Sequence, residues 1–312
     1  MGKYTQNEKQ MPRKAEERIV MSIVKKAVIP AAGLGTRMLP ISRAVPKEML
    51  PIVDRPAISY LVDEAVASGI TDILIITNRD KDIMEDYFDI SPEYEQKLRD
   101  SGKTAEIDTM YECAQKANIY FMRQKVTKGL GHAVGCAKAF VGNEPFAVLY
   151  GDDIIFSEKP VCSQLIEAYE KYGRAVCGVK AVPEELVTKY CSLKTAPIDG
   201  SENCFFVDDM IEKPRPEQIW SNYSILGRVL LTPDVFDIIE DLEPGAGGEI
   251  QLTDAMKKIS QTVGMTAVDF EGTRFDMGSK LGFLTANVIR GAKDPELGEA
   301  FREFLRDFAK TI

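Results

Sequence analysis

Histidine is nearly missing from this sequence of 312 residues, which contains only His132. Catalysis by Ser-His-Asp or Cys-His groups, and metal sites made of several histidines, need more than one such residue easily supplies. Carboxylates, lysines and arginines must therefore carry out any catalysis. This composition favours metal-assisted transfer of a phosphoryl or nucleotidyl group over acyl transfer.

Cysteine motifs, long apolar runs and an excess of positive charge are also lacking. The six cysteines form no CxxC pair and no cluster with metal-ligand spacing, which is typical of reduced core residues in a cytoplasmic protein. No apolar run approaches the length of a membrane span, so we expect no membrane partner. The net charge of −9 argues against a nucleic-acid-binding surface.

Hydrophobic residues make up 45% of the chain, which is enough for a large buried core. In the first half, short apolar runs typical of buried strands, such as residues 27–29, 72–77 and 146–150, alternate with helical patterns. This alternation predicts an α/β fold with a doubly wound sheet. Ligands of such sheets bind beyond the carboxyl ends of the strands.

A glycine-rich stretch follows the first apolar run. A loop of small residues, 31–35, leads into Arg37, and Lys47 comes ten residues later. Glycines let a backbone approach an anion closely, and Arg and Lys bind phosphates. The loop lacks the third glycine of a dinucleotide fingerprint and the GK[ST] end of a P-loop, so alone an ordinary tight turn explains it equally well. With Lys47 in the same stretch, we favour binding of a nucleoside triphosphate.

Acidic residues follow the buried strand at 146–150. Asp152 and Asp153 are adjacent there, and two such carboxylates are costly unless they meet a cation or hydrogen-bond donors. A solvated turn is the alternative. Asp276 follows another strand-like run, and together with Asp152 and phosphate oxygens it would suit Mg²⁺. Spacing alone does not decide that pairing.

Two further stretches leave their role open. Glu212 and Lys213 close a long strand with one acceptor and one cation, but exposed Glu–Lys pairs are common. The glycine-rich segment 245–254 is interpreted most simply as a loop that feeds a helix capped by Thr253.

Eight stretches, in order between about residues 25 and 290, carry a resemblance to a known family. They are AVIPAAGLGTRMLP, VPKEMLPIVDRPAISYLVDEA, KGLGHAV, GDD, IEKP, LGR, GGEIQLTDA and FDMGSKLG. The chain resembles the bacterial UTP–glucose-1-phosphate uridylyltransferases (UDP-glucose pyrophosphorylases) of the sugar nucleotidyltransferase family. This resemblance implies a Rossmann-like mixed, mostly parallel sheet flanked by helices.

The resemblance also implies a reaction. UMP would pass from UTP to glucose 1-phosphate, giving UDP-glucose and pyrophosphate, by Mg²⁺-assisted in-line attack with no covalent intermediate. The site residues implied by the matching motifs are Arg37, Lys47 and Lys213 (catalytic), Ala32, Gly33, Glu48, Gln124 and Gly129 (nucleotide), Asp153, Tyr190, Cys191 and Glu212 (sugar), and Asp152 and Asp276 (metal).

Composition and the resemblance together predict how the chain is divided. Residues 1–20 are polar and lack periodicity, which predicts a mobile N-terminal extension. Residues 21–293 form the expected catalytic domain, and residues 294–312 form a C-terminal helix. Its apolar stripe, which includes Phe301 and Phe304, is typical of a core or dimer contact, and we expect a homodimer or homotetramer.

One residue departs from the family pattern. The family has Tyr-Gly-Val near the sugar, whereas this chain has Tyr190-Cys191-Ser192. If the backbone needs a positive φ there, or if the sugar approaches Cα closely, Cys191 introduces strain or a clash. In ordinary β geometry the backbone contact survives. Two alternatives therefore remain: a nucleotidyltransferase for another sugar 1-phosphate or for dTTP, and a low-activity homologue that binds nucleotide and regulates a partner.

Overall fold

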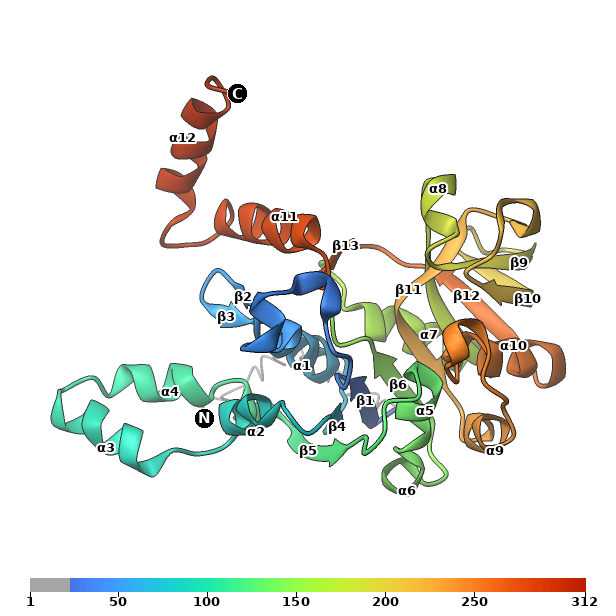
Figure 1. Cartoon of the computed structure of the whole chain (residues 1–312), viewed down its shortest axis with the longest axis horizontal. Coiled ribbons are helices and arrows are strands. Elements are labelled where there is room, and N and C mark those ends of the chain that lie inside the picture. The colour runs from blue at the N-terminus through green and yellow to red at the C-terminus, as the bar shows by residue number, and fades with distance from the viewer. Residues whose placement is uncertain (1–22) are drawn as a thin grey trace, which may run out of the picture.

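The computed structural model describes residues 23–312, and the expected extension at 1–20 lies outside the described residues. Its centre is a nine-stranded sheet in the order β5-β4-β1-β6-β11-β8-β12-β10-β9 (Figure 1). Seven of these strands run in one direction, and β10 and β11 run in the other. The predicted mixed, mostly parallel sheet flanked by helices is confirmed.

The strands of this sheet are β1 (Lys26–Pro30), β4 (Asp72–Thr77), β5 (Asn118–Arg123), β6 (Phe146–Leu149), β8 (Ala175–Ala181), β9 (Cys191–Pro197), β10 (Cys204–Glu212), β11 (Tyr223–Leu231) and β12 (Met265–Asp269). Two small ribbons pair β2 (Pro51–Ile52) with β3 (Arg55–Pro56) and β7 (Asp153–Phe156) with β13 (Thr273–Asp276). The helices are α1 (Ala57–Ala67), α2 (Asp82–Phe88), α3 (Pro92–Asp100), α4 (Ala105–Tyr111), α5 (Leu130–Gly135), α6 (Lys138–Val141), α7 (Val161–Tyr172), α8 (Glu184–Val187), α9 (Asp234–Glu240), α10 (Leu252–Thr262), α11 (Lys280–Gly291) and α12 (Gly298–Phe308).

Both faces of the sheet are buried, which explains the uninterrupted apolar runs of its central strands. Successive side chains of a strand point to opposite faces. Val28 of β1 and Leu74 of β4 accordingly lie in one core cluster, while Ala27, Ile29 and Ile75 lie in another.

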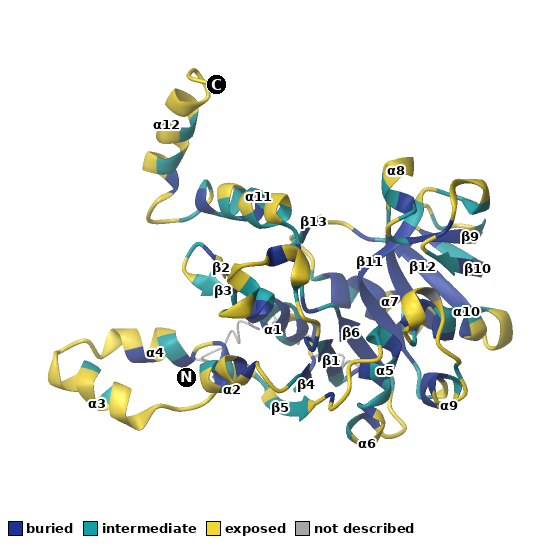
Figure 2. Cartoon of the chain, viewed as in Figure 1, coloured by how far each residue is buried: buried dark blue, intermediate teal, exposed yellow. Residues whose placement is uncertain are grey.

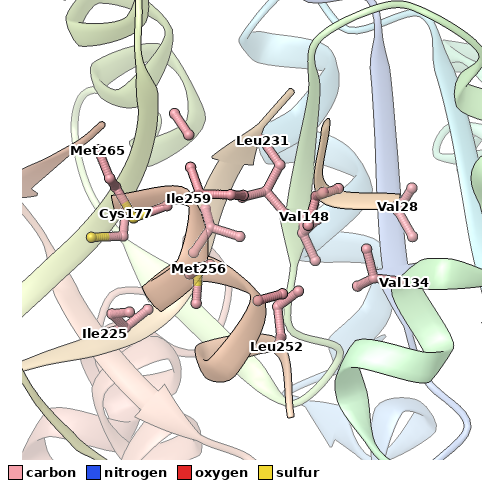
Figure 3. Packing of buried hydrophobic residues seen from close by; sticks show 14 of the residues in the cluster. Val28, Val134, Val148, Cys177, Ile225, Leu231, Leu252, Met256, Ile259 and Met265 are labelled. Carbon is pink, nitrogen blue, oxygen red and sulfur yellow. The ribbon is translucent and has the colours of Figure 1, made fainter. Parts of the chain in front are cut away.

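Helices close the two faces. Residues of α5, α9 and α10 belong to the cluster around Val28, and α1 belongs to the cluster on the opposite face. Figure 3 shows Leu252, Met256 and Ile259 of α10 lying against the sheet, among side chains that include Val148 and Leu231. Packing on both faces therefore restrains the central strands, and it fixes the points at which the loops leave the sheet.

The periphery is much more exposed than this core. Figure 2 shows α3 and α12 coloured mainly as exposed, and α12 extends away from the body beyond α11. Three apolar side chains of α11 stay exposed at helical spacing, Leu281, Leu284 and Val288, as do Phe304 and Phe308 of α12. No helix among residues 23–312 is both long and apolar enough to cross a membrane.

Strand order places a switch point between β1 and β6. From β1 the chain adds β4 and β5 on one side, and it then returns to add β6 on the other side of β1. Ligands of doubly wound sheets bind in the crevice that such a reversal opens. The glycine-rich loop after β1 and the turn Gly151–Asp153 after β6 both start at this edge.

Besides the two-residue strands β2 and β3, the sequence did not predict β7 or β9. β7 begins at Asp153 and pairs with β13, and β9 forms the edge of the main sheet beside β10. The β9 segment, CSLKTAP, has only a short apolar start and ends in Pro197, as edge strands tolerate. Its pairing with β10 is long-range information that the local pattern does not contain.

A buried ion pair joins α1 to β11. The Arg228 guanidinium donates to both carboxylate oxygens of Glu64, at 2.9 and 2.6 Å, and to the backbone oxygen of Asp153 at 2.8 Å. The Arg228 and Glu64 side chains are only 1% and 9% exposed. The pair therefore also fixes the backbone of the turn after β6.

Replacing Glu64 tests this link. Glu64→Ala leaves the Arg228 charge buried without its partner, so we expect the free energy of unfolding to fall by about 3–5 kcal/mol. The matched control is Asp63→Ala, one residue earlier on the same helix. The Asp63 side chain is 28% exposed and pairs with Arg55 and Lys116, and its loss should cost about 1 kcal/mol or less. Urea denaturation measures both changes, and equal losses would contradict the argument.

Candidate active site

The side chain of Lys47 lies against the backbone of the glycine-rich loop. The loop enters a single 3-10 turn, Thr36–Met38, through Gly35, whose φ of 65° lies in the left-handed region that favours glycine. A Cβ at Gly33 would lie 3.8 Å from Lys47 Nζ, and one at Gly35 would lie 3.3 Å from Ser42 Cβ. The ammonium group therefore lies against the loop backbone, as the phosphate-binding interpretation requires.

Two aspartates meet two cations at this edge of the sheet. Lys47 Nζ donates to Asp152 Oδ2 at 2.6 Å, and Arg37 Nη1 donates to Asp276 Oδ2 at 2.8 Å. Arg37 Nη2 also lies 3.6 Å from Asp152 Oδ2. The β7–β13 ribbon causes this meeting, since it pairs Asp276 with Asp153, the residue after Asp152. The structure thus brings together the two aspartates that spacing alone could not pair.

The cations also set the protonation of this cluster. Burial raises the pKa of the Asp152 carboxyl, but the charges of Lys47, Arg37 and Arg274 together outweigh burial and lower that pKa below its ordinary value. In return, and against the effect of burial, Asp152 raises the pKa of Lys47. Both groups are therefore charged at neutral pH.

Gly278 makes the convergence sterically feasible. A Cβ at this position would lie 2.6 Å from Arg37 Nη2, 2.6 Å from Asp152 Oδ2 and 2.9 Å from Asp276 Oδ1. All three atoms are side-chain ends, so they could move away from an added methyl group at little cost in stability. They would then no longer occupy their present positions relative to one another.

Two cavities open at this edge and share Tyr150 and Asp152. The glycine-loop cavity, of about 440 Å³, is lined by residues that include Ala32, Gly33, Lys47, Glu48, Gln124 and Gly129. The Tyr190 cavity, of about 670 Å³, is lined by residues that include Arg37, Asp153, Tyr190, Lys213, Arg274 and Asp276. Both volumes are in the range of small-molecule sites.

A buried ion pair includes Glu48, which lines the glycine-loop cavity. Glu48 is 1% exposed, and its Oε2 atom accepts from Lys81 Nζ at 2.8 Å. Lys81 also donates to the backbone oxygen of Ala31. Burial raises the pKa of Glu48 and lowers that of Lys81, although each partner opposes the other's shift. Sequence reasoning missed Lys81, because nothing in its own segment points to the loop fifty residues earlier.

Three residues that line the Tyr190 cavity, Asp153, Arg274 and Tyr190, are connected by hydrogen bonds. Arg274 Nε donates to Asp153 Oδ1 at 2.7 Å, and Arg274 Nη1 donates to the Tyr190 hydroxyl at 3.0 Å. Burial raises the pKa of Asp153 to about 6, with Arg274 opposing the shift and the carboxylates of Asp152 and Asp276 adding to it. Arg274 was also missed, although side-chain alternation along β13 puts it on the same face as Asp276.

Lys213 reaches the Tyr190 cavity from a strained backbone position. Its φ of 46° is uncommon for a residue with a side chain, and such strain often lies at functional sites. The Lys213 amide donates to the Tyr190 carbonyl at 2.7 Å, which ties the end of β10 to the start of β9.

Two residues implied for the sugar lie beside the cavity wall instead of lining it. Cys191 is 3% exposed in the hydrophobic core, where its Sγ accepts from the Ile225 amide at 3.2 Å. Cys191 is the first residue of β9 and does not have a positive φ, so the backbone strain considered from the sequence does not arise. Glu212 accepts from Thr253 Oγ1 at 2.8 Å, and burial raises the pKa of Glu212.

The predicted cap at Thr253 is wrong. Helix α10 begins at Leu252, with Gln251 as the N-cap residue, because the Thr253 hydroxyl binds Glu212. The preceding loop packs on α5 and the residues before it: the Gly131 amide donates to the Ile250 carbonyl at 2.8 Å, and the Ile250 amide donates to the Lys128 carbonyl at 2.7 Å. This loop therefore forms a wall of the site, a role that its sequence did not imply.

A comparison with known protein families identifies the family of this chain. A family model described as nucleotidyl transferase matches residues 26–290. The chain belongs to this family. The match spans every residue named above for the two cavities, and it ends just before α12.

Relatives of this nucleotidyl transferase have closely related names. A protein of Bacillus subtilis (strain 168) named UTP–glucose-1-phosphate uridylyltransferase is 47% identical over 285 residues, covering 91% of this chain and 97% of the relative. A solved structure titled as UTP-bound UGPase from Acinetobacter baumannii is 38% identical, with a TM-score of 0.81, over 90% of this chain and 98% of the other. A UDP-glucose pyrophosphorylase complexed with UDP-glucose is 39% identical, with a TM-score of 0.78, over 87% and 100%.

Gly278→Ala tests how strictly the nucleotidyl transferase site depends on the aspartate cluster. We expect nucleotidyl transfer to fall by about 100-fold, because ångström-scale displacement of catalytic groups costs that much, while the free energy of unfolding changes by about 0.5 kcal/mol or less. The control is Gly173→Ala, remote from both cavities, where φ is 64°. It should cost about 1–2 kcal/mol of stability and leave the rate unchanged. Steady-state rates and urea denaturation measure both; parallel losses would refute the distinction.

Proposed function

We propose that this nucleotidyl transferase transfers UMP from UTP to glucose 1-phosphate, giving UDP-glucose and pyrophosphate. The printed names of its relatives support this substrate pair. The observation that carries the proposal is the pair of adjoining cavities that share Tyr150 and Asp152. Two substrates held in such cavities would meet at the aspartate cluster.

In this proposal the glycine-loop cavity holds UTP. Ala32 and Gly33 lie against the uridine, and Glu48, Gln124 and Gly129 lie near the base. The glycine-rich backbone can approach the nucleotide closely, since no side chain intervenes. The buried Lys81–Glu48 pair keeps this loop in place through Ala31.

The aspartate cluster fits a magnesium ion. Among residues 23–312, no group of three or more His, Cys, Asp or Glu side chains is placed to hold a metal ion. Mg²⁺ commonly uses only one or two carboxylates and completes its shell with substrate phosphates and water, so Asp152 and Asp276 would hold it. Bound there, Mg²⁺ would neutralise charge on the phosphates.

Arg37, Lys47 and Lys213 are then the catalytic cations. An oxygen of the sugar phosphate attacks the α-phosphorus in line, and no covalent intermediate forms. The chain's own contribution is positioning and neutralisation of charge on the transferring and leaving groups. Arg37 and Lys47 balance the two aspartates in the present structure, and the phosphates of UTP offer them new partners.

The Tyr190 cavity takes the sugar phosphate. Asp153 accepts hydrogen bonds from sugar hydroxyls, with Arg274 and Tyr190 fixing its carboxylate, and Lys213 holds the phosphate. Glu212 and Cys191 support this wall from behind. The low-activity alternative rested on backbone strain at Cys191 or on a clash between this residue and the sugar. Cys191 has no positive φ, and it is 3% exposed in the core, which argues against both.

We also propose self-association and a cytoplasmic location. The exposed apolar side chains of α11 and α12 suit contact with a second copy in a homodimer or homotetramer, which sedimentation of the purified chain would measure. The six cysteines are free, as is typical of reducing compartments, and fractionation of cells would test the location.

Pyrophosphate release tests the proposed reaction. UTP and glucose 1-phosphate should give the fastest release in a panel of four nucleoside triphosphates and several sugar 1-phosphates, and release should require Mg²⁺. Asp152→Asn should lower the rate by at least about 100-fold, since a metal ligand is lost. Asp269→Asn is the matched control: Asp269 pairs with Lys180 at 2.6 Å, as Asp152 does with Lys47, but lines neither cavity. An unchanged rate in Asp152→Asn would sink the metal assignment.

The raised pKa of Asp153 predicts a pH dependence. As the pH falls through about 6, the Asp153 carboxylate gains a proton and is no longer an anionic acceptor for the sugar hydroxyls. The KM for glucose 1-phosphate should therefore rise by about tenfold. The sugar phosphate itself titrates at a pKa of about 6, so the control is Asp153→Asn, which retains only that contribution. The same pH profile of KM in the variant and the wild type would show that Asp153 does not bind the sugar as an anion.

A further inference from the structure

The single histidine contacts a residue of the glycine-loop cavity. Gln124 is 4% exposed, and its side-chain nitrogen Nε2 lies 3.2 Å from the Gly129 carbonyl and 2.7 Å from His132 Nδ1. His132 comes from α5, which starts directly after Gly129. Both contacts of the amide nitrogen therefore come from one rigid segment.

The chemistry of these contacts fixes the orientation of the amide. A backbone carbonyl only accepts, so the Gln124 atom that faces Gly129 must be the NH₂ group. The second hydrogen of this group then points to His132 Nδ1, which must accept and so carries no proton. The neutral ring is consequently protonated on Nε2.

The carbonyl oxygen of the same amide is left for a ligand. Among the described residues, no group donates to Gln124 Oε1, and this atom is not among the buried polar atoms without a partner. Gln124 lines the glycine-loop cavity. With its NH₂ group occupied, Gln124 can offer this cavity an acceptor but no donor.

We propose that His132 is a positioning residue that locks Gln124 as a fixed acceptor and thereby selects uracil over cytosine. The proposal rests on the assignment of UTP to the glycine-loop cavity. Uracil presents N3–H as a donor, whereas N3 of cytosine is itself an acceptor and would face the lone pairs of Oε1. A site whose buried polar group is left unpaired rejects the wrong base.

The surroundings of His132 keep it in the neutral form that the lock needs. Burial and the nearby ammonium of Lys128 lower the pKa of His132. His132 itself lines a separate cavity of about 680 Å³, whose charged and titratable lining residues are Lys128, Cys136 and Glu240. A protonated ring would donate at Nδ1 and turn the amide around.

Two variants with different acceptors test the lock. His132→Phe keeps an aromatic ring but removes the acceptor at 2.7 Å. Only the longer contact of 3.2 Å with the Gly129 carbonyl then holds the NH₂ group, so Gln124 can rotate more readily and offer this group to cytosine. We expect the ratio of kcat/KM for UTP to that for CTP to fall by about tenfold, the value of one hydrogen bond. His132→Asn retains an acceptor bonded to Cγ and should keep the ratio within about threefold of the wild type. Equal losses for UTP and CTP in His132→Phe would reveal a merely structural role and overturn the proposal.

A spectroscopic measurement on the wild-type chain needs no variant. The natural chain has one histidine, so untagged protein labelled with ¹⁵N gives the signals of a single imidazole ring. We expect an unprotonated Nδ1 and a protonated Nε2 at pH 7.5; the opposite tautomer would overturn the lock. Wild-type protein that releases no pyrophosphate from UTP and glucose 1-phosphate would contradict the proposed function instead.

Discussion

The mutual neutralisation of Asp152, Asp276, Arg37 and Lys47 is the interaction on which the rest of the site depends. Strand order and the register of the β7–β13 ribbon force the two aspartates together. Two nearby carboxylates without compensation would be costly in this partly buried place. The two cations remove that cost, and they are also the groups that a polyphosphate requires. In the proposed function, stability of the free protein and affinity for an anionic substrate with a metal ion would thus come from one arrangement of charge.

Close backbone approach is the second constraint. A Cβ at Gly151 would lie 2.7 Å from the Pro30 carbonyl, where β1 and β6 diverge, and one at Gly131 would lie 2.8 Å from the Ile250 carbonyl. The first contact sets the distance between the glycine-rich loop and Asp152. The second seats the wall that closes the glycine-loop cavity. Glycine is needed at these places because two backbones touch there, and hardly any other residue could fit.

The sequence predicted local and repeated features well, and long-range partners poorly. The apolar runs at 27–29 and 72–77 became neighbouring strands, because buried parallel strands are apolar on both faces. Arg274 and Lys81 escaped notice, since each acts on a residue more than thirty positions away. Cys191 shows a related limit: the family motif implied a sugar-binding residue at this position, yet strand alternation turns its thiol into the core.

The geometry separates the common chemistry from the choice of substrates. The charge cluster lies where the two cavities join. In the proposed function it would contact groups that any nucleoside triphosphate and any sugar phosphate possess. The Gln124–His132 contact lies at one end, and the Asp153–Arg274–Tyr190 chain lies in the other cavity. Since the two recognition groups share no residue, a change in one can alter base or sugar choice without disturbing the other or the cluster between them. A fold built this way can keep one reaction while its substrates diverge.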